Sequence, residues 1–145
     1  MAATQSEPLL MHNTMRITPG HVEEFHQAVR RAVEFAEQHG PQYMVQVFVD
    51  HTQLVAHSFQ LYADSAAVLR HWSLSDPYIS DVMRHCTVES LELYGEPDEA
   101  VSEGLASMLA DGVLRQAGRH AVGFVRGPQA VESERRRSDS TGQGP

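Results

Sequence analysis

Alternating hydrophobic and polar positions open the chain, and a helical period follows them. In residues 9–17 every second residue falls on the same side, which predicts a strand whose one face carries Leu9, Met11, Asn13, Met15 and Ile17. From Val22 to Ala36 the apolar positions recur at helical spacing. Thr18 and Pro19 have the residue types of a helix start, and Gly40 followed by Pro41 has those of a helix end.

Two β-rich segments follow this helix. Residues 43–50 and 53–62 are rich in β-branched and aromatic residues, and the polar stretch 50–52 between them predicts a turn. In the second segment the more apolar side holds Val55, His57, Phe59 and Leu61. We therefore expect this side to face the interior.

A second helical region is predicted from Asp64 or Ser65, either of which is a suitable N-cap. Pro77 interrupts the pattern, so we expect a break there and a further short helix to about Arg84. Residues 87–95 then predict a fourth strand.

The predicted order is strand, helix, strand, strand, helix, strand. It indicates an α+β domain, a ferredoxin-like antiparallel sheet with helices on one face. The other face is predicted to pair with a second copy in a homodimer. We expect it to carry Leu10, His12, Thr14, Leu54, Ala56, Ser58 and Tyr62.

The chain divides into four parts on this reading. Residues 1–8 form a flexible N-terminus, 9–95 the domain, 96–127 an extension and 128–145 a disordered tail. Within the extension, residues 96–118 predict an extra C-terminal helix, and residues 120–127 predict a short strand. The buried stripe of that helix is expected to be Val101, Leu105, Met108, Leu109 and Val113.

Composition narrows the classes of function. The chain has 145 residues, 41% of them hydrophobic, and a formal net charge of −8, which disfavours nucleic acid as a partner. All basic residues are arginine, so Schiff-base chemistry and the P-loop are excluded. The lone Cys86 allows no internal disulfide. We find no membrane span and no secretion signal and expect a cytoplasmic protein.

Three segments together resemble a known family. "NTMRITPGHVEEF", "HSFQLYADSAAVLRHWSLSDPYISDV" and "LELYG" are similar to the antibiotic biosynthesis monooxygenase-like proteins over residues 9–95. The resemblance implies a dimeric α/β barrel with a pocket between helices and sheet. It also implies a range of activities, from cofactor-free oxygenation of polyketide quinols to cyclisation, isomerisation and haem degradation.

The resemblance also implies which residues line the pocket. The sheet would contribute Met11, Asn13, Met15, His57 and Phe59, and the second helical region would add His71, Trp72, Tyr78 and His85. Tyr78 stands six residues after Trp72, as in the oxygenases of the group. Two positions depart from the oxygenase pattern: Val68 replaces an expected asparagine, and Glu92 replaces an expected basic residue.

Each candidate has a structural and a functional interpretation. His57 is either a core histidine or a base that removes a phenolic or α-carbonyl proton, with Asn13 and Tyr78 as the other catalytic residues. Trp72 either packs in the core or stacks on a flat substrate. His85 at the end of its helix is explained by the helix dipole alone, and His71 ranks below His57.

The leading hypothesis is a small homodimeric enzyme that oxygenates an aromatic or polyketide-type substrate with dioxygen and no organic cofactor. Three alternatives remain open: a cyclase or isomerase acting by enolisation, a non-catalytic ligand-binding module, and a haem-binding or haem-degrading protein. The haem alternative matches Asn13 and Trp72, but the proximal histidine would fall near Val82, with His85 displaced from it. No metal site is predicted, because the histidines show no HxH or HExxH spacing.

Overall fold

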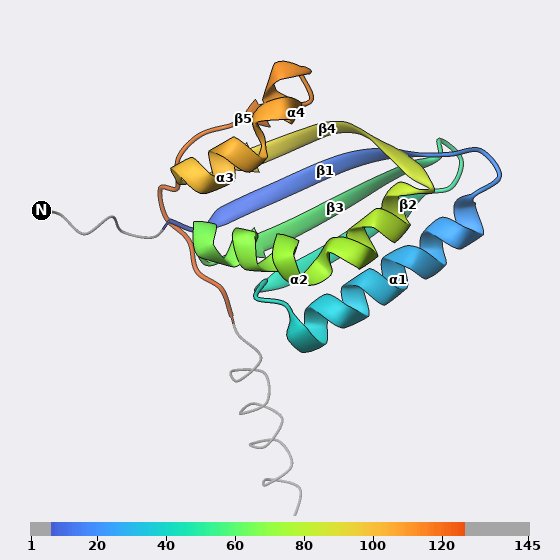
Figure 1. Ribbon diagram of the computed structural model, residues 1–145, viewed down its shortest axis with the longest axis horizontal. Coiled ribbons are helices and arrows are strands. Elements are labelled where there is room, and N and C mark those ends of the chain that lie inside the picture. Colours follow the sequence, from blue (N-terminus) through green and yellow to red (C-terminus); the bar gives the residue numbers. More distant parts are fainter. Residues whose placement is uncertain (1–6, 127–145) are drawn as a thin grey trace, which may run out of the picture.

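The computed structural model describes residues 7–126, and they form one mixed sheet with helices on one of its faces (Figure 1). The elements follow the ferredoxin-like order and then add an extension. They are β1 (Leu9–Ile17), α1 (Val22–His39), β2 (Met44–Asp50), β3 (Val55–Tyr62), α2 (Ser65–Met83), β4 (Cys86–Tyr94), α3 (Glu99–Gly104), α4 (Ala106–Ala110) and β5 (Leu114–Gln116).

The sheet has the strand order β2-β3-β1-β4-β5. The first four strands pair antiparallel, and β5 pairs parallel to β4 at the edge. The α+β fold class, the antiparallel pairing of the predicted strands and the helices on one face are confirmed.

The two long helices differ from the expectations at the positions of their prolines. Helix α1 begins at Val22, after Pro19 and Gly20, and Gly20 has a φ of 86°, so these two residues form a turn before the helix. Helix α2 begins after Asp64, whose side chain accepts a hydrogen bond from the Ala67 N–H at 2.9 Å. It continues through Pro77 without the predicted break, because residues on both sides of the proline pack toward the sheet.

The helices and the strand of the extension after residue 95 are shorter than the hydrophobic pattern predicts. Two helices, α3 and α4, replace the single helix expected over 96–118. Val101 and Leu105 are buried as expected, whereas Leu109 is exposed. The extra strand lies at Leu114–Gln116 and not at 120–127, and the described residues 120–126 form no strand. The tail predicted over 128–145 lies outside the described residues.

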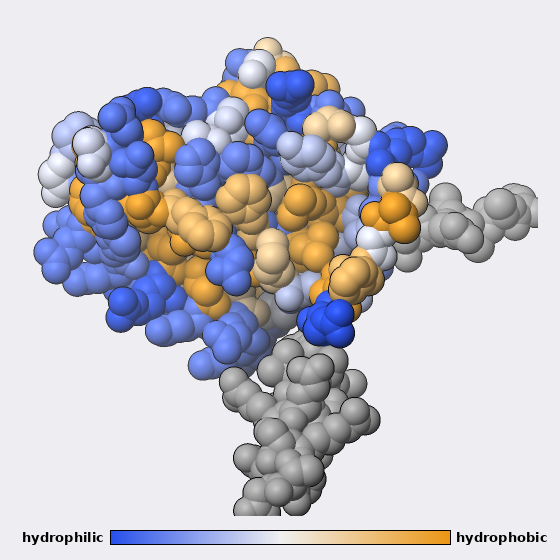
Figure 2. Space-filling view, turned by 180° about the vertical axis from the view of Figure 1, so that it is seen from behind, coloured by the Kyte–Doolittle hydropathy of each residue, from blue (hydrophilic) through white to orange (hydrophobic). Residues whose placement is uncertain are grey.

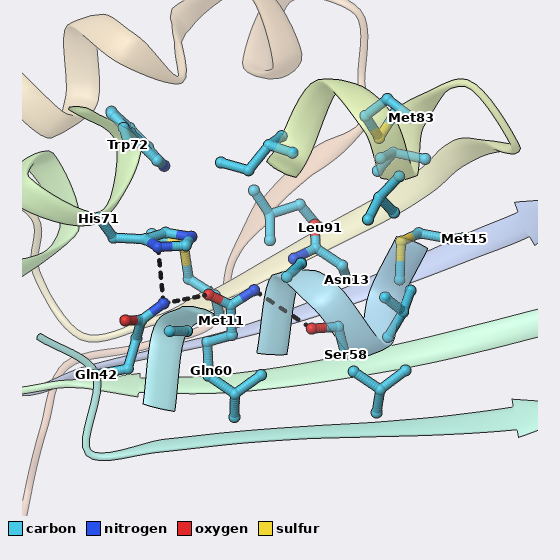
Figure 3. A pocket seen from close by; sticks show the side chains of 18 of the residues that line it. Met11, Asn13, Met15, Gln42, Ser58, Gln60, His71, Trp72, Met83 and Leu91 are labelled. Atoms are coloured by element: carbon cyan, nitrogen blue, oxygen red, sulfur yellow. Dashed lines mark hydrogen bonds between the residues drawn. The ribbon is translucent and has the colours of Figure 1, made fainter. Parts of the chain in front are cut away.

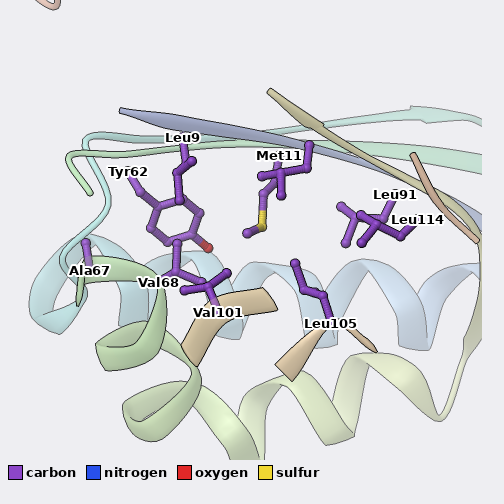
Figure 4. Close-up of a cluster of buried hydrophobic side chains, with 10 residues drawn as sticks. Leu9, Met11, Tyr62, Ala67, Val68, Leu91, Val101, Leu105 and Leu114 are labelled. Carbon is purple, nitrogen blue, oxygen red and sulfur yellow. The ribbon is translucent and has the colours of Figure 1, made fainter. Parts of the chain in front are cut away.

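Buried side chains form two clusters at opposite ends of the helix-facing side of the sheet. One cluster lies under α3, where Tyr62, Val68 and Val101 pack against β1 and β4 (Figure 4). The other surrounds Phe25 and Ile17. Between the clusters the side chains are smaller, and this position holds the cavity described next.

Register settles which residues face the helices. Asn13 lies opposite Ser58 and Met11 lies opposite Gln60, so the even-numbered residues of β3 share the helix-facing side with the odd-numbered residues of β1. His57 pairs with Thr14 and therefore points to the other side, which we call the open face. The expectation that Val55, His57, Phe59 and Leu61 face the interior is wrong.

Candidate functional site

A cavity of about 370 Å³ lies between the sheet and the helices. This volume falls in the range of roughly 300–1,000 Å³ that small-molecule sites occupy. The lining comes from four strands, four helices and two residues between elements, Gln42 and Leu105. Its members are Met11, Asn13, Met15, Val29, Ala32, Val33, Ala36, Gln42, Val45, Val47, Ser58, Gln60, His71, Trp72, Ile79, Val82, Met83, Val88, Leu91, Gly104, Leu105 and Met108.

The cavity exists because small side chains stand where a filled core would have large ones. Helix α1 presents Ala32 and Ala36 to it, and β3 presents Ser58. At the rim Trp72 lies against Gly104 of α3, where a Cβ atom would come within 2.4 Å of the indole ring. The glycine therefore allows α3 to approach the indole closely, and the extension completes the wall of the cavity.

Polar groups gather at one end of the cavity (Figure 3). The amide nitrogen of Gln42 lies 2.8 Å from His71 Nδ1 and 3.4 Å from Gln60 Oε1. Gln60 Nε2 lies 3.3 Å from Ser58 Oγ. Ser75 Oγ lies 3.0 Å from His71 Nδ1, one turn further along α2. These side chains form a continuous hydrogen-bonded row beside an otherwise apolar cavity.

His71 is the titratable group in this row that faces the cavity. Burial lowers the pKa of its imidazole to about 4, so the ring is neutral at pH 7. Nδ1 is engaged by Gln42 and Ser75, and the other ring nitrogen points toward the cavity (Figure 3). The structure thus places His71 in the site, although the sequence ranks it below His57.

The predicted site residues separate into two groups. Met11, Asn13, Met15, His71 and Trp72 line the cavity, as expected. The other four, His57, Phe59, Tyr78 and His85, do not line it.

His57 and Phe59 both contact His12 on the open face. His57 Nδ1 lies 2.9 Å from His12 Nε2, and the Phe59 ring stacks on His12 with centroids 4.3 Å apart. Their assignment to the pocket is wrong, because the apolar side of β3 is the open face. His12 lies on the open face, as its alternation with Asn13 predicts.

Tyr78 and His85 contact neighbouring elements outside the cavity. The Tyr78 ring stacks on Phe35 of α1 with centroids 4.4 Å apart, which joins the two helices. His85 Nδ1 lies 3.1 Å from His21 Nδ1, just beyond the end of α2. Both were expected in the pocket. Instead, Tyr78 connects α2 to α1, and His85, two residues beyond the end of α2, contacts His21 just before α1.

Gln42, Ser58, Gln60 and Ser75 were not predicted from the sequence. One signal was available for Ser75, since it follows His71 by one helical turn within an apolar stripe of α2. Ser58 was expected on the open face together with Ala56 and Tyr62, and that expectation is wrong, because Ser58 lines the cavity and the other two are buried on the helix-facing side. Gln60 was assigned to neither face. Gln42 lies before β2, where no periodicity applies.

Haem does not fit this site. The lining residue at the position expected for the proximal ligand is Val82, and His85 is held by His21 outside the cavity. No lining residue among those described carries a cation that would pair with the haem propionates. Within residues 7–126 there is also no cluster of three or more histidine, cysteine or acidic side chains able to hold a metal ion.

Cys86 is buried at the start of β4, and its thiol lies 3.5 Å from the Val82 carbonyl oxygen. Burial raises the pKa of this thiol to about 11, so it stays protonated at neutral pH. None of the helices described is both long and apolar enough to cross a lipid bilayer.

The fold is ferredoxin-like and α+β, and it has a candidate small-molecule cavity between its helices and its sheet. Solved structures that share this fold include the cofactor-independent oxygenase SnoaB and two proteins described as proposed antibiotic biosynthesis monooxygenases. No protein-family model matches the sequence, and no curated protein matches it either.

Three solved structures illustrate the likeness. MupZ from Pseudomonas fluorescens is 13% identical, with a TM-score of 0.62, and the match covers 85% of this chain and 97% of that one. SnoaB from Streptomyces nogalater, a cofactor-independent oxygenase, is 14% identical, with a TM-score of 0.54 over 64% and 96% of the two chains. A proposed antibiotic biosynthesis monooxygenase from Caulobacter crescentus CB15 is 14% identical, with a TM-score of 0.53 over 61% and 87%.

These likenesses concern the fold. The match to MupZ covers so much of this chain that it extends beyond residue 95 into the extension. The matches to SnoaB and the Caulobacter protein span a share of this chain close to that of residues 9–95 alone.

Proposed function

We propose that the protein is a small enzyme that oxygenates a flat, uncharged aromatic or polyketide-type molecule with dioxygen and without an organic cofactor. The observation that carries this proposal is the cavity, apolar over most of its surface and bordered at one end by the neutral row around His71. The likeness of the fold to SnoaB, described as a cofactor-independent oxygenase, supports the reaction class.

The substrate supplies all the electrons in this scheme. An anthrone-type ketone or its phenol tautomer loses one proton to water and becomes a resonance-stabilised anion. The carbon of that anion transfers an electron to dioxygen, and the two radicals combine into a C–O bond. Protonation gives a hydroperoxide, which loses water as its O–O bond breaks and its remaining C–H proton leaves. The CH₂ group becomes a carbonyl, and the second oxygen atom leaves as water.

The residues of the cavity bind, orient and exclude water. In this proposal His71 and Asn13 hydrogen-bond oxygen atoms of the substrate, which favours the anion in a site of low dielectric. Trp72, which also lines the cavity, stacks on the aromatic plane. The methionines and valines keep the reacting carbon in an apolar environment. Orientation and charge stabilisation are therefore the contributions of the protein.

Measurement of dioxygen uptake tests this proposal. We expect the purified, chelator-treated protein to accelerate dioxygen consumption by anthrone-type substrates above their spontaneous oxidation. His71→Leu removes the hydrogen bond to the anion and is expected to lower the rate by about 10- to 100-fold. Tyr78→Phe keeps its stacking on Phe35 outside the cavity and should retain the rate.

The outcomes separate the candidate functions. Substrate conversion that proceeds equally well without dioxygen would identify an enolisation enzyme, a cyclase or isomerase, and would contradict oxygenation. Saturable binding with no conversion at all would identify a ligand-binding module.

We propose in addition that the protein is a homodimer joined through the open face. Exposed aromatic side chains support this assignment: Phe48 on β2, Tyr94 on β4 and Tyr43 just before β2 are 60%, 39% and 59% exposed. Figure 2, which views the molecule from the side opposite to Figure 1, shows hydrophobic residues gathered within a hydrophilic border. A second copy would cover them.

A further inference from the structure

The hydrogen-bonded row at the end of the cavity has a defined direction. It starts at Tyr62, whose side chain is buried and whose pKa burial raises, so the phenol keeps its proton. The hydroxyl donates to Gln60 Oε1 at 2.5 Å. Gln60 therefore points its oxygen toward Tyr62 and Gln42, and its nitrogen donates to Ser58 Oγ.

This direction fixes the orientation of the next amide. Because Gln60 presents an oxygen, Gln42 must turn its nitrogen toward it, at 3.4 Å. The same nitrogen lies 2.8 Å from His71 Nδ1. The carbonyl oxygen Oε1 of Gln42 is then left buried without a hydrogen-bond partner. An unpaired buried acceptor costs stability, and the two contacts of the amide nitrogen with Gln60 and His71 offset that cost.

The orientation of Gln42 decides which nitrogen of His71 carries the proton. An N–H group at 2.8 Å needs the lone pair of Nδ1, and the Ser75 hydroxyl lies beside the same nitrogen at 3.0 Å. The neutral ring therefore carries its proton on Nε2. Since Nε2 points toward the cavity, His71 presents a hydrogen-bond donor there and not a base (Figure 3).

We propose that Gln42 is a positioning residue that fixes His71 as a hydrogen-bond donor, and that the site consequently selects uncharged, flat ligands that present a carbonyl oxygen. The inference deepens the proposed function and rests on the same cavity being the substrate site. It specifies the form in which the substrate is recognised, the keto form, with its oxygen at Nε2–H.

The charge of the lining supports this selectivity. No residue that lines the cavity, within the described part of the chain, is lysine, arginine, aspartate or glutamate. A carboxylate entering the cavity would lose its hydration and find no cation to pair with. A ketone loses far less hydration on entering the cavity, and its oxygen gains a hydrogen bond from the Nε2–H group of His71.

Three tricyclic probes of the same shape test the proposal: fluorenone, which has a carbonyl acceptor, carbazole, which has an N–H donor, and fluorene, which has neither. Trp72 is the only tryptophan of the chain and lines the cavity, so quenching of its fluorescence reports binding there. We expect fluorenone to bind about tenfold more tightly than fluorene. Carbazole should bind no more tightly than fluorene, and fluorene-9-carboxylate more weakly than all three.

A matched pair of variants assigns the preference to Gln42. Gln42→Leu removes the N–H group that holds Nδ1, and we expect the fluorenone preference to fall to about threefold or less while fluorene affinity is retained. Gln46→Leu makes the same substitution on β2 opposite Phe59, on the open face, and should keep the full preference. An equal preference in both variants would overturn the role of Gln42.

The tautomer itself is measurable without any ligand. Nitrogen-15 NMR of the full-length protein distinguishes a protonated from an unprotonated ring nitrogen, and His71→Asn identifies the signal. We expect Nε2–H at neutral pH in the wild-type protein. A proton found on Nδ1, or carbazole preferred over fluorenone, would overturn the proposal.

These readouts do not depend on oxygenation. Fluorenone has no C–H bond that dioxygen attacks in this scheme, so its binding order is independent of turnover. Dioxygen uptake without a ketone preference would remove the role of Gln42 and leave the proposed reaction. A ketone preference without dioxygen uptake would leave the role of Gln42 and remove the proposed reaction.

Discussion

At the scale of single residues, burial of His71 couples the stability of the fold to pH. The pKa of the imidazole is about 4 in the folded protein and 6.5 when it is unperturbed, so the unfolded chain binds the proton first. Stability is full above pH 6.5 and falls as the pH is lowered toward 4. The loss attributable to this residue is on the order of 2 kcal/mol.

Denaturant unfolding between pH 4 and 7 checks this prediction. His71→Asn removes the titrating group, and we expect its free energy of unfolding to depend less steeply on pH than that of the wild-type protein. His39→Asn is a matched control, because His39 lies exposed in the last turn of α1. Parallel pH curves for wild type and His71→Asn would contradict the assignment.

Residue-scale prediction from the sequence succeeds on β1 and fails on β3, for a physical reason. On β1 the methionines and Asn13 alternate with charged or polar partners, so the interior side is evident. On β3 the apolar residues occupy the open face, while Ser58 and Gln60 line the cavity. On β3 the polar residues line the cavity and the more apolar residues lie on the open face. Hydrophobicity therefore does not indicate which side of this strand faces the helices.

At the scale of elements, α3 completes the cavity by its contact with Trp72. Gly104→Ala would place a Cβ atom 2.4 Å from the indole ring, so either the indole or α3 must move. We expect this variant to lose fluorenone affinity by about tenfold and to unfold more easily, by roughly 1–3 kcal/mol. Fluorescence titration and thermal unfolding measure the two effects.

Gly123→Ala is the matched control for that substitution. Its added Cβ would meet only His120, at an ordinary 3.5 Å. Both affinity and stability should therefore stay close to those of the wild-type protein. Unchanged affinity in Gly104→Ala would show that the wall formed by α3 is not part of the binding site.

Helices and strands were predicted well where hydrophobic residues recur with a clear period along the sequence. They were predicted poorly where the prediction depended on a single residue, such as a proline. Strand β1 and the end of α1 match the expectation. Pro77 was expected to break α2, but packing of His71 and Ser75 on one side and Ile79 on the other holds one continuous helix. Of the strand expected over 120–127, the described residues 120–126 pair with no strand of the sheet, whereas Leu114–Gln116 pairs with β4.

At the scale of the whole molecule, the open face predicts association. Phe48→Glu places a carboxylate among the exposed aromatic residues of that face, and we expect it to shift the protein from dimer to monomer in analytical ultracentrifugation. Leu109→Glu changes an equally exposed apolar residue on α4 and should leave the dimer intact. A monomeric wild-type protein, or a Phe48→Glu dimer of unchanged affinity, would contradict the proposed homodimer.

The central claim is that this cavity brings dioxygen and an uncharged aromatic ketone together. Its most direct test is turnover of an anthrone under isotopically heavy dioxygen, followed by mass spectrometry of the product. We expect one heavy oxygen atom in the new carbonyl, the other in water, and a rate that depends on His71. Product formed with ordinary oxygen from water, or at the same rate without the protein, would contradict the claim.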